Sequence, residues 1–141
     1  MDTLTPAERS ERMGRVRCKD TGPELVVRRL VYGLGFRYRL HNRRLPGAPD
    51  LVFPRMQKAI MVHGCFWHRH SSTRCKLARL PKSKLDFWLA KLESNRLRDL
   101  RNLAKLRRVG WRVLVIWECQ LVEPRAVERR IVRFLKEELD A

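Results

Sequence analysis

A stretch of mixed cysteine, histidine and aromatic residues at positions 60–75, IMVHGCFWHRHSSTRC, carries the side chains best suited to chemistry. Cys65, His70 and Cys75 follow one another at intervals of five residues, so a folded loop can present two thiolates and an imidazole to one tetrahedral ion. The spacing therefore predicts a metal site that needs one more ligand. The alternative is that the thiols are buried as small apolar groups and the histidines pack against aromatic rings.

Asp50 is a second candidate, because it opens a short apolar strand predicted at 51–53, directly after the turn-forming segment LPGAP. A second apolar strand, predicted at 59–62, ends at His63. A hairpin of these two strands would bring a carboxylate, a main-chain carbonyl and an imidazole together, and Mg²⁺ prefers oxygen ligands of this kind. His63 could equally be a packed strand-end histidine. Glu24 lies in the first turn of a helix predicted at 22–34, where the helix dipole favours a carboxylate whatever its function.

The remaining elements must position these residues. A half-buried strand is predicted at 36–40, and a long helix is predicted from a Ser83 cap to Gly110. Its apolar stripe, expected to be mostly core, consists of Leu85, Trp88, Leu89, Leu92, Leu100, Leu103 and Leu106. The continuous apolar run at 111–117 predicts a central strand buried on both faces. Cys119 follows that strand and is a candidate fourth ligand, and a last amphipathic helix is predicted at 124–139.

Composition restricts the class of protein. The chain has 141 residues, with 32 Lys and Arg against 15 Asp and Glu, and a formal net charge of +17. This length fits one domain, and the charge indicates a polyanionic partner, most simply nucleic acid. We expect a basic N-terminal arm at 1–20, with Arg12 and Arg15 on phosphates, and an α/β domain at 21–141. No apolar run is long enough to span a membrane, so a cytoplasmic location is expected.

With these motifs in place, the chain resembles the very-short-patch repair endonucleases. The resemblance runs over nearly the whole chain and is carried by LPGAPD at 45–50, HGCFWHRH at 63–70, FWL at 87–89 and GWRVLVIWEC at 110–119. It implies a single-domain α/β fold of the restriction-endonuclease (PD-(D/E)XK) type. Such a fold has a central mixed β-sheet flanked by helices, here with a structural zinc site.

The resemblance also implies roles for individual residues. Asp50 and the main-chain carbonyl of Val62 would bind catalytic Mg²⁺; the best-known members carry threonine at the second position. Glu24, His63 and His68 would complete the catalytic site, with His68 assisting attack by water. Structural zinc would be held by Cys65, His70, Cys75 and Cys119, and the aromatic wedges into the base stack would be Phe66, Trp67 and Trp88.

The expected activity is Mg²⁺-dependent nicking of one strand of double-stranded DNA beside a T:G mismatch. We expect a monomer, with possible assistance from mismatch-repair proteins. Two alternatives remain open from the residues. One is a restriction-type or general repair nuclease of the same fold, and the other is a non-catalytic, zinc-stabilised nucleic-acid-binding module.

Overall fold

The computed structural model describes residues 21–71, 75–80 and 82–137. The predicted N-terminal arm, with Arg12 and Arg15, lies outside these residues. The helices and strands are α2 (Gly22–Gly33), β1 (Arg39–Leu40), β2 (Leu51–Phe53), β3 (Lys58–His63), α3 (Leu85–Arg108), β4 (Arg112–Trp117) and α4 (Pro124–Lys136). Three 3₁₀ segments connect them: η1 (Pro54–Met56), η2 (Lys76–Ala78) and η3 (Glu118–Val122).

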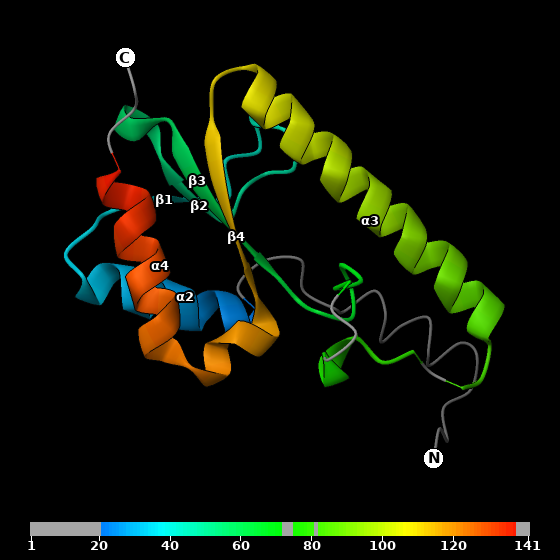
Figure 1. Cartoon of the computed structure of the whole chain (residues 1–141). Coiled ribbons are helices and arrows are strands. Elements are labelled where there is room, and N and C mark those ends of the chain that lie inside the picture. Colours follow the sequence, from blue (N-terminus) through cyan, green and yellow to red (C-terminus); the bar gives the residue numbers. More distant parts are fainter. Residues whose placement is uncertain (1–20, 72–74, 81, 138–141) are drawn as a thin grey trace.

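A mixed sheet forms the middle layer of the described residues. Its strand order is β1-β2-β3-β4, antiparallel except for the parallel pair β3 and β4. Helices α2 and α4 pack together on one face of the sheet, and α3 lies across the other (Figure 1). The predicted mixed sheet flanked by helices is thus confirmed.

Strand β3 is the centre of the sheet and is buried at all six positions. Its residues alternate between the two faces. Ile60 and Val62 belong to the core shared with Val27 of α2 and Ile131 of α4. The prediction that 111–117 would be the central strand is wrong: β4 pairs only with β3 among the described residues, and only Ile116 in β4 is buried. The run of apolar residues in β4 arises because helices cover both faces of this strand, and it does not require a paired strand at each edge.

Helix α2 begins as its sequence predicts and brings Glu24 to the end of the sheet. The Thr21 side chain accepts a hydrogen bond from the backbone N–H of Glu24 at 3.4 Å, and Pro23 lies in the first turn. The helix ends at Gly33, and Gly35 adopts a φ of 95° just beyond it. The strand predicted at 36–40 is shorter than expected, because only Arg39 and Leu40 pair with β2.

Helix α3 departs from the prediction in two ways. Its cap is Lys84 in a left-handed conformation, with no side-chain capping bond, so Ser83 is not the cap. Most of the predicted leucine stripe is not core: in α3 only Leu92 and Leu106 are buried, whereas Leu85 is 42% and Leu100 is 50% exposed. A helix of 24 residues is about 36 Å long, whereas a six-residue strand spans about 20 Å, so α3 extends past the sheet (Figure 1). Among the described helices, none is long and apolar enough to cross a lipid bilayer.

Candidate active site and metal clusters

A cavity of about 680 Å³ lies at the end of the sheet where β2 begins and β3 ends. The predicted residues Glu24, Asp50, Val62, His63 and His68 all line it, and so does Trp67. These residues come from the start of α2, from the β2–β3 hairpin and from the loop that follows β3. The antiparallel pairing of β2 with β3 brings the two strand ends together, as the sequence predicts.

Two carboxyl groups that line this cavity meet each other. Asp50 accepts a hydrogen bond from the backbone N–H of Val62 at 2.7 Å, which fixes its side chain across the hairpin. Its carboxyl group is also hydrogen-bonded to that of Glu24, which is 1% exposed. Two acids this close are not both ionised unless a cation lies between them, and without one they share a proton.

The pKa values of the two acids are driven apart. The pKa of Asp50 is raised to about 8, mainly by burial; the Glu24 carboxylate contributes in the same direction, and the hydrogen bond from Val62 opposes both. Burial also opposes ionisation of Glu24, but hydrogen bonds from His41 and Asp50 outweigh it and lower the pKa of Glu24. In the absence of a cation, the pair therefore keeps one proton near neutral pH, on Asp50. A divalent cation could replace that proton.

Two stacked imidazoles also line the cavity. The rings of His63 and His68 are nearly parallel, with centroids 4.0 Å apart. Burial lowers the pKa of His63 to about 4, and repulsion from His68 contributes, so His63 is neutral near pH 7. His68 donates from Nδ1 to Asp99 of α3 at 2.6 Å, which leaves its Nε2 to accept a proton. Of the pair, His68 is therefore the one arranged as a base.

Asp99 was missed in the sequence, although α3 carries a signal for it. The buried residues Leu92 and Leu106 share a helix face with three polar residues at alternating spacings of three and four, namely Asn95, Asp99 and Asn102. Asn95 donates to the carbonyl of Trp67 at 3.1 Å, and Asn102 packs against Gly47 so closely that a Cβ there would lie 3.0 Å from it. Polar residues on the face of a helix that packs against the core indicate that they contact polar groups of the elements packed against that helix.

His41 was also missed. Its Nε2 lies 3.0 and 2.9 Å from the two carboxylate oxygens of Glu24, and a ligand atom from each of His41, Glu24 and Asp50 lies within 4.8 Å of the others. No spacing in the sequence links His41 to Glu24, because the contact depends on where β1 ends relative to α2.

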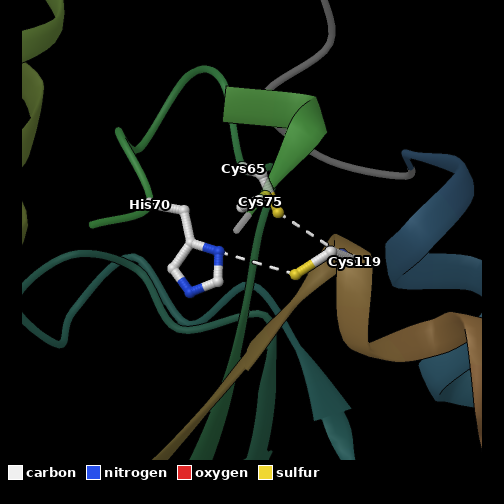
Figure 2. A group of neighbouring side chains, drawn as sticks. All are labelled: Cys65, His70, Cys75 and Cys119. Atoms are coloured by element: carbon white, nitrogen blue, oxygen red, sulfur yellow. Dashed lines mark hydrogen bonds between the residues drawn. The ribbon is translucent and has the colours of Figure 1, made fainter. Parts of the chain in front are cut away.

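The predicted cysteine and histidine ligands converge in a separate cluster (Figure 2). Cys65 and His70 come from the loop after β3, Cys75 precedes η2, and Cys119 lies in η3 directly after β4. One ligand atom from each lies within 4.8 Å of all the others, and His70 Nδ1 is 3.5 Å from the Cys119 sulfur. Tetrahedral zinc with bonds of about 2.0 to 2.3 Å requires ligand separations of about 3.5 to 3.8 Å, so the four residues fit that ion after small adjustments.

The sulfurs of this cluster are not joined by disulfides. The backbone N–H of Cys119 donates to the Cys65 sulfur at 3.3 Å, and among the described residues none of the three cysteines forms a disulfide. Burial raises the pKa of Cys65 to about 12, so without a cation this sulfur is a thiol near neutral pH, and it would lose its proton on binding one.

Trp117 connects the cavity with the cysteine and histidine cluster. Its ring stacks on His70, with centroids 4.2 Å apart and planes 10° apart, and it meets His63 edge-on at 5.1 Å. His63 and Trp117 are partners in the parallel register of β3 and β4. The orientation of one catalytic candidate is thus fixed by the same ring that packs on a candidate metal ligand.

The three predicted aromatic wedges form one cluster, of which Trp67 lines the cavity. Phe66, Trp67 and Trp88 make mutual edge-to-face contacts with centroids 5.1 to 6.0 Å apart. Each is half-buried, and the adjacent Phe87 is 51% exposed. The rings therefore form a partly exposed apolar surface rather than part of the core.

The comparisons with known proteins agree with one another. The sequence model of the family described as DNA mismatch endonuclease Vsr matches residues 1–74. The chain is 48% identical to the type II nicking enzyme V.XorIIP of Xanthomonas oryzae pv. oryzae, over 95% of this chain and 96% of that protein. It is 39% identical to the type II nicking enzyme V.NmeAIP of Neisseria meningitidis, over 99% and 98% of the two chains. It is also 39% identical to the DNA mismatch endonuclease Vsr of Escherichia coli, over 85% and 75%.

The raised pKa of Asp50 predicts a pH-dependent cost to stability when no divalent cation is added. Between the ordinary carboxyl value of 3.8 and the folded value of about 8, the folded state keeps a proton that the unfolded state releases. This contribution therefore makes the folded protein less stable as pH rises through that window. Asp50→Asn removes it, so the variant should melt several degrees above the wild type, and the difference should grow up to about pH 8 and then level off.

Thermal denaturation at about pH 6 and about pH 8.5 measures this difference. Asp86→Asn is the matched control, because it removes an exposed carboxylate from the first turn of α3. A wild type and an Asp50→Asn variant that melt alike at both pH values would show that the Asp50 carboxyl is not held at a raised pKa.

Proposed function

The chain belongs to the Vsr family of DNA mismatch endonucleases, and from that premise we propose that it nicks one strand of duplex DNA beside a T:G mismatch in a Mg²⁺-dependent reaction. It is a DNA endonuclease. The observation that carries the proposal is one cavity lined by both the Asp50–Glu24 carboxyl pair and the His63–His68 pair. Phosphodiester hydrolysis needs a cation site and a base, and this cavity offers both.

In the proposed site, Asp50 and the main-chain carbonyl of Val62 hold Mg²⁺, with Glu24 beside them. Bound Mg²⁺ supplies charge compensation for the pentacovalent phosphate. Two observations support the fit of Mg²⁺ to these residues. The donor atoms are oxygens, and in the absence of a cation the carboxyl pair keeps a proton that Mg²⁺ would replace. Because the Val62 N–H already binds Asp50, the hairpin fixes the carboxylate beside the main chain of the same residue that would offer its carbonyl.

His68 takes the proton of the attacking water in this proposal. Its hydrogen bond to Asp99 orients the imidazole and stabilises the positive charge that it acquires. The neighbouring His63 is neutral because of burial, so it contacts the scissile phosphate as a hydrogen-bonding group and does not repel the charged His68. Stacking at 4.0 Å holds both rings in one orientation.

We propose that Cys65, His70, Cys75 and Cys119 hold a structural zinc ion. Four protein ligands close the shell and leave no open position for substrate, which is typical of structural zinc. The cluster joins the loop after β3 to the segment after β4. It therefore stiffens the loop that carries Phe66, Trp67 and His68.

The aromatic cluster supports mismatch recognition. Phe66, Trp67 and Trp88 would insert into the base stack, which costs a few kcal/mol per step and costs least at a mismatch. Selectivity then comes from how easily the DNA deforms rather than from reading every base. Arg12 and Arg15 remain proposed phosphate contacts of the N-terminal arm.

The central experiment uses one duplex with a T:G mismatch and the same duplex fully paired, each with and without Mg²⁺. The wild type should nick one strand of the mismatched duplex, and only with Mg²⁺. Asp50→Asn should lower that rate by about 100-fold or more, because a ligand of the catalytic cation supplies several kcal/mol of transition-state stabilisation. DNA binding should be unchanged or tighter, since a negative charge near phosphate is removed, and Asp86→Asn should nick like the wild type.

Other outcomes select the alternatives. Cutting of both duplexes at equal rates indicates a restriction-type or general repair nuclease of the same fold. Binding without cutting under any condition indicates a non-catalytic nucleic-acid-binding module.

Zinc content tests the cysteine and histidine cluster. Purified wild type should carry about one zinc per chain, and Cys119→Ala should lose it and melt at a temperature lower by several degrees or more. Elemental analysis and thermal denaturation measure these effects. Cys18→Ala is the control and should keep the zinc, because the proposed four-ligand shell is complete without this cysteine. Full zinc content in Cys119→Ala would show that the fourth ligand is assigned wrongly.

Trp67→Ala tests the aromatic wedge. Base stacking on an aromatic ring is worth about 1 to 3 kcal/mol, so the preference for mismatched over matched duplex should fall by about 10-fold or more. Because Trp67 is only half-buried, the melting temperature should change little. Tyr32→Ala, which removes an exposed ring from α2, is the control. Equal weakening on both duplexes would assign discrimination to another element.

A further inference from the structure

His41 has an unusual backbone position at the edge of the cavity. It follows β1 directly and adopts a φ of 48°, in the left-handed region that is costly for a residue with a side chain. Its backbone N–H donates to the carbonyl of Asp50 at 3.1 Å. The chain therefore turns sharply at this residue while it stays attached to the backbone of the proposed metal ligand.

The side chain of His41 points back to Glu24 on α2. Its Nε2 lies 3.0 and 2.9 Å from the two carboxylate oxygens, so it donates its N–H between them. Arg28, one turn further along the helix, forms an ion pair with the same carboxylate and lies 3.5 Å from the His41 ring nitrogen. The buried Glu24 carboxylate is thus held from the β1 side and from its own helix, with Asp50 as its third neighbour.

We propose that His41 is a positioning residue for the nicking reaction, one that holds the Glu24 carboxylate against Asp50 so that both acids face the catalytic cation together. This inference rests on the proposed function. Mg²⁺ prefers oxygen ligands, so the imidazole acts through Glu24 rather than on the ion. Hydrogen bonds to the residues around a metal site commonly set its affinity in this way.

A contact that only held β1 against α2 would require neither the left-handed backbone of His41 nor its bond to the buried Glu24 carboxylate. Tyr38, three residues earlier, already donates its hydroxyl to the carbonyl of Arg28 at 3.2 Å and joins the same two segments. It does so without backbone strain and without a buried charge. A strained residue that stabilises a buried acid in contact with a second acid indicates instead that the acid pair itself must be kept.

The test compares zinc-loaded wild type with His41→Leu, His41→Gln and Tyr38→Phe. Leucine fills a similar volume without a donor, glutamine places an N–H near the position of Nε2, and Tyr38→Phe removes the other link between the same segments. Two quantities are measured: the Mg²⁺ concentration at half-maximal nicking of the T:G duplex, and the affinity for Mn²⁺ followed by electron paramagnetic resonance.

In His41→Leu the Mg²⁺ midpoint should rise and the Mn²⁺ affinity should fall, each by about 10-fold. His41→Gln should recover most of both losses, and Tyr38→Phe should match the wild type in both. Should His41→Leu fail to fold, His41→Asn replaces it, because the asparagine amide is too short to reach Glu24.

The two proposals fail in different ways. A wild type that nicks the mismatched duplex, together with a His41→Leu variant of unchanged Mg²⁺ midpoint and Mn²⁺ affinity, overturns the role of His41 and leaves the proposed function standing. A wild type that nicks no duplex overturns the proposed function, and the Mn²⁺ affinities still decide whether His41 positions the acid pair. Failure of His41→Gln to recover Mn²⁺ affinity would show that the Nε2–H donor is not what matters.

Discussion

His63 and Trp117 are partners in the parallel register of β3 and β4, so the segments that follow these two residues leave the sheet at the same edge. Cys65 and His70 follow one strand, and Cys119 follows the other. A shift of this register by two residues would move Cys119 by about 6 Å along the strand and separate it from the other sulfurs. The cysteine and histidine cluster and the position of His63 therefore depend on one strand pairing.

The carboxyl pair depends on a different constraint, which is the hairpin of β2 and β3. The backbone N–H of Val62 takes the Asp50 carboxylate as its partner. That bond ties the acid to the central buried strand, while Glu24 arrives from the first turn of α2 on the neighbouring layer. Helix α2 and the β2–β3 hairpin pack together through apolar contacts, and this packing brings the two acids into contact. The repulsion between two carboxylates then favours a cation at that point.

The sequence predicts best where functional residues lie close to the ends of adjacent strands. Asp50 and His63 belong to one hairpin, and the cluster ligands flank two paired strands, so pairing alone brings them together. His41 and Asp99 could not be found this way, because their contacts depend on where β1 ends and on which face α3 presents. The apolar run of β4 gave the wrong prediction of a central strand for a related reason. Such a run indicates that both faces of a strand are covered, but it does not indicate which strands pair with it.

The two clusters differ in donor chemistry, so they suit different cations. Thiolates and an imidazole select a soft or borderline ion, whereas carboxylate and carbonyl oxygens suit Mg²⁺. The loop at 63–70 takes part in both, since Cys65 and His70 belong to one cluster while His63 and His68 line the cavity. Trp117 packs between His63 and His70, so one ring contacts both groups. A net charge of +17 attracts DNA without selecting one phosphate, so the choice of the phosphate that is cut depends on the groups that the cavity holds in fixed positions.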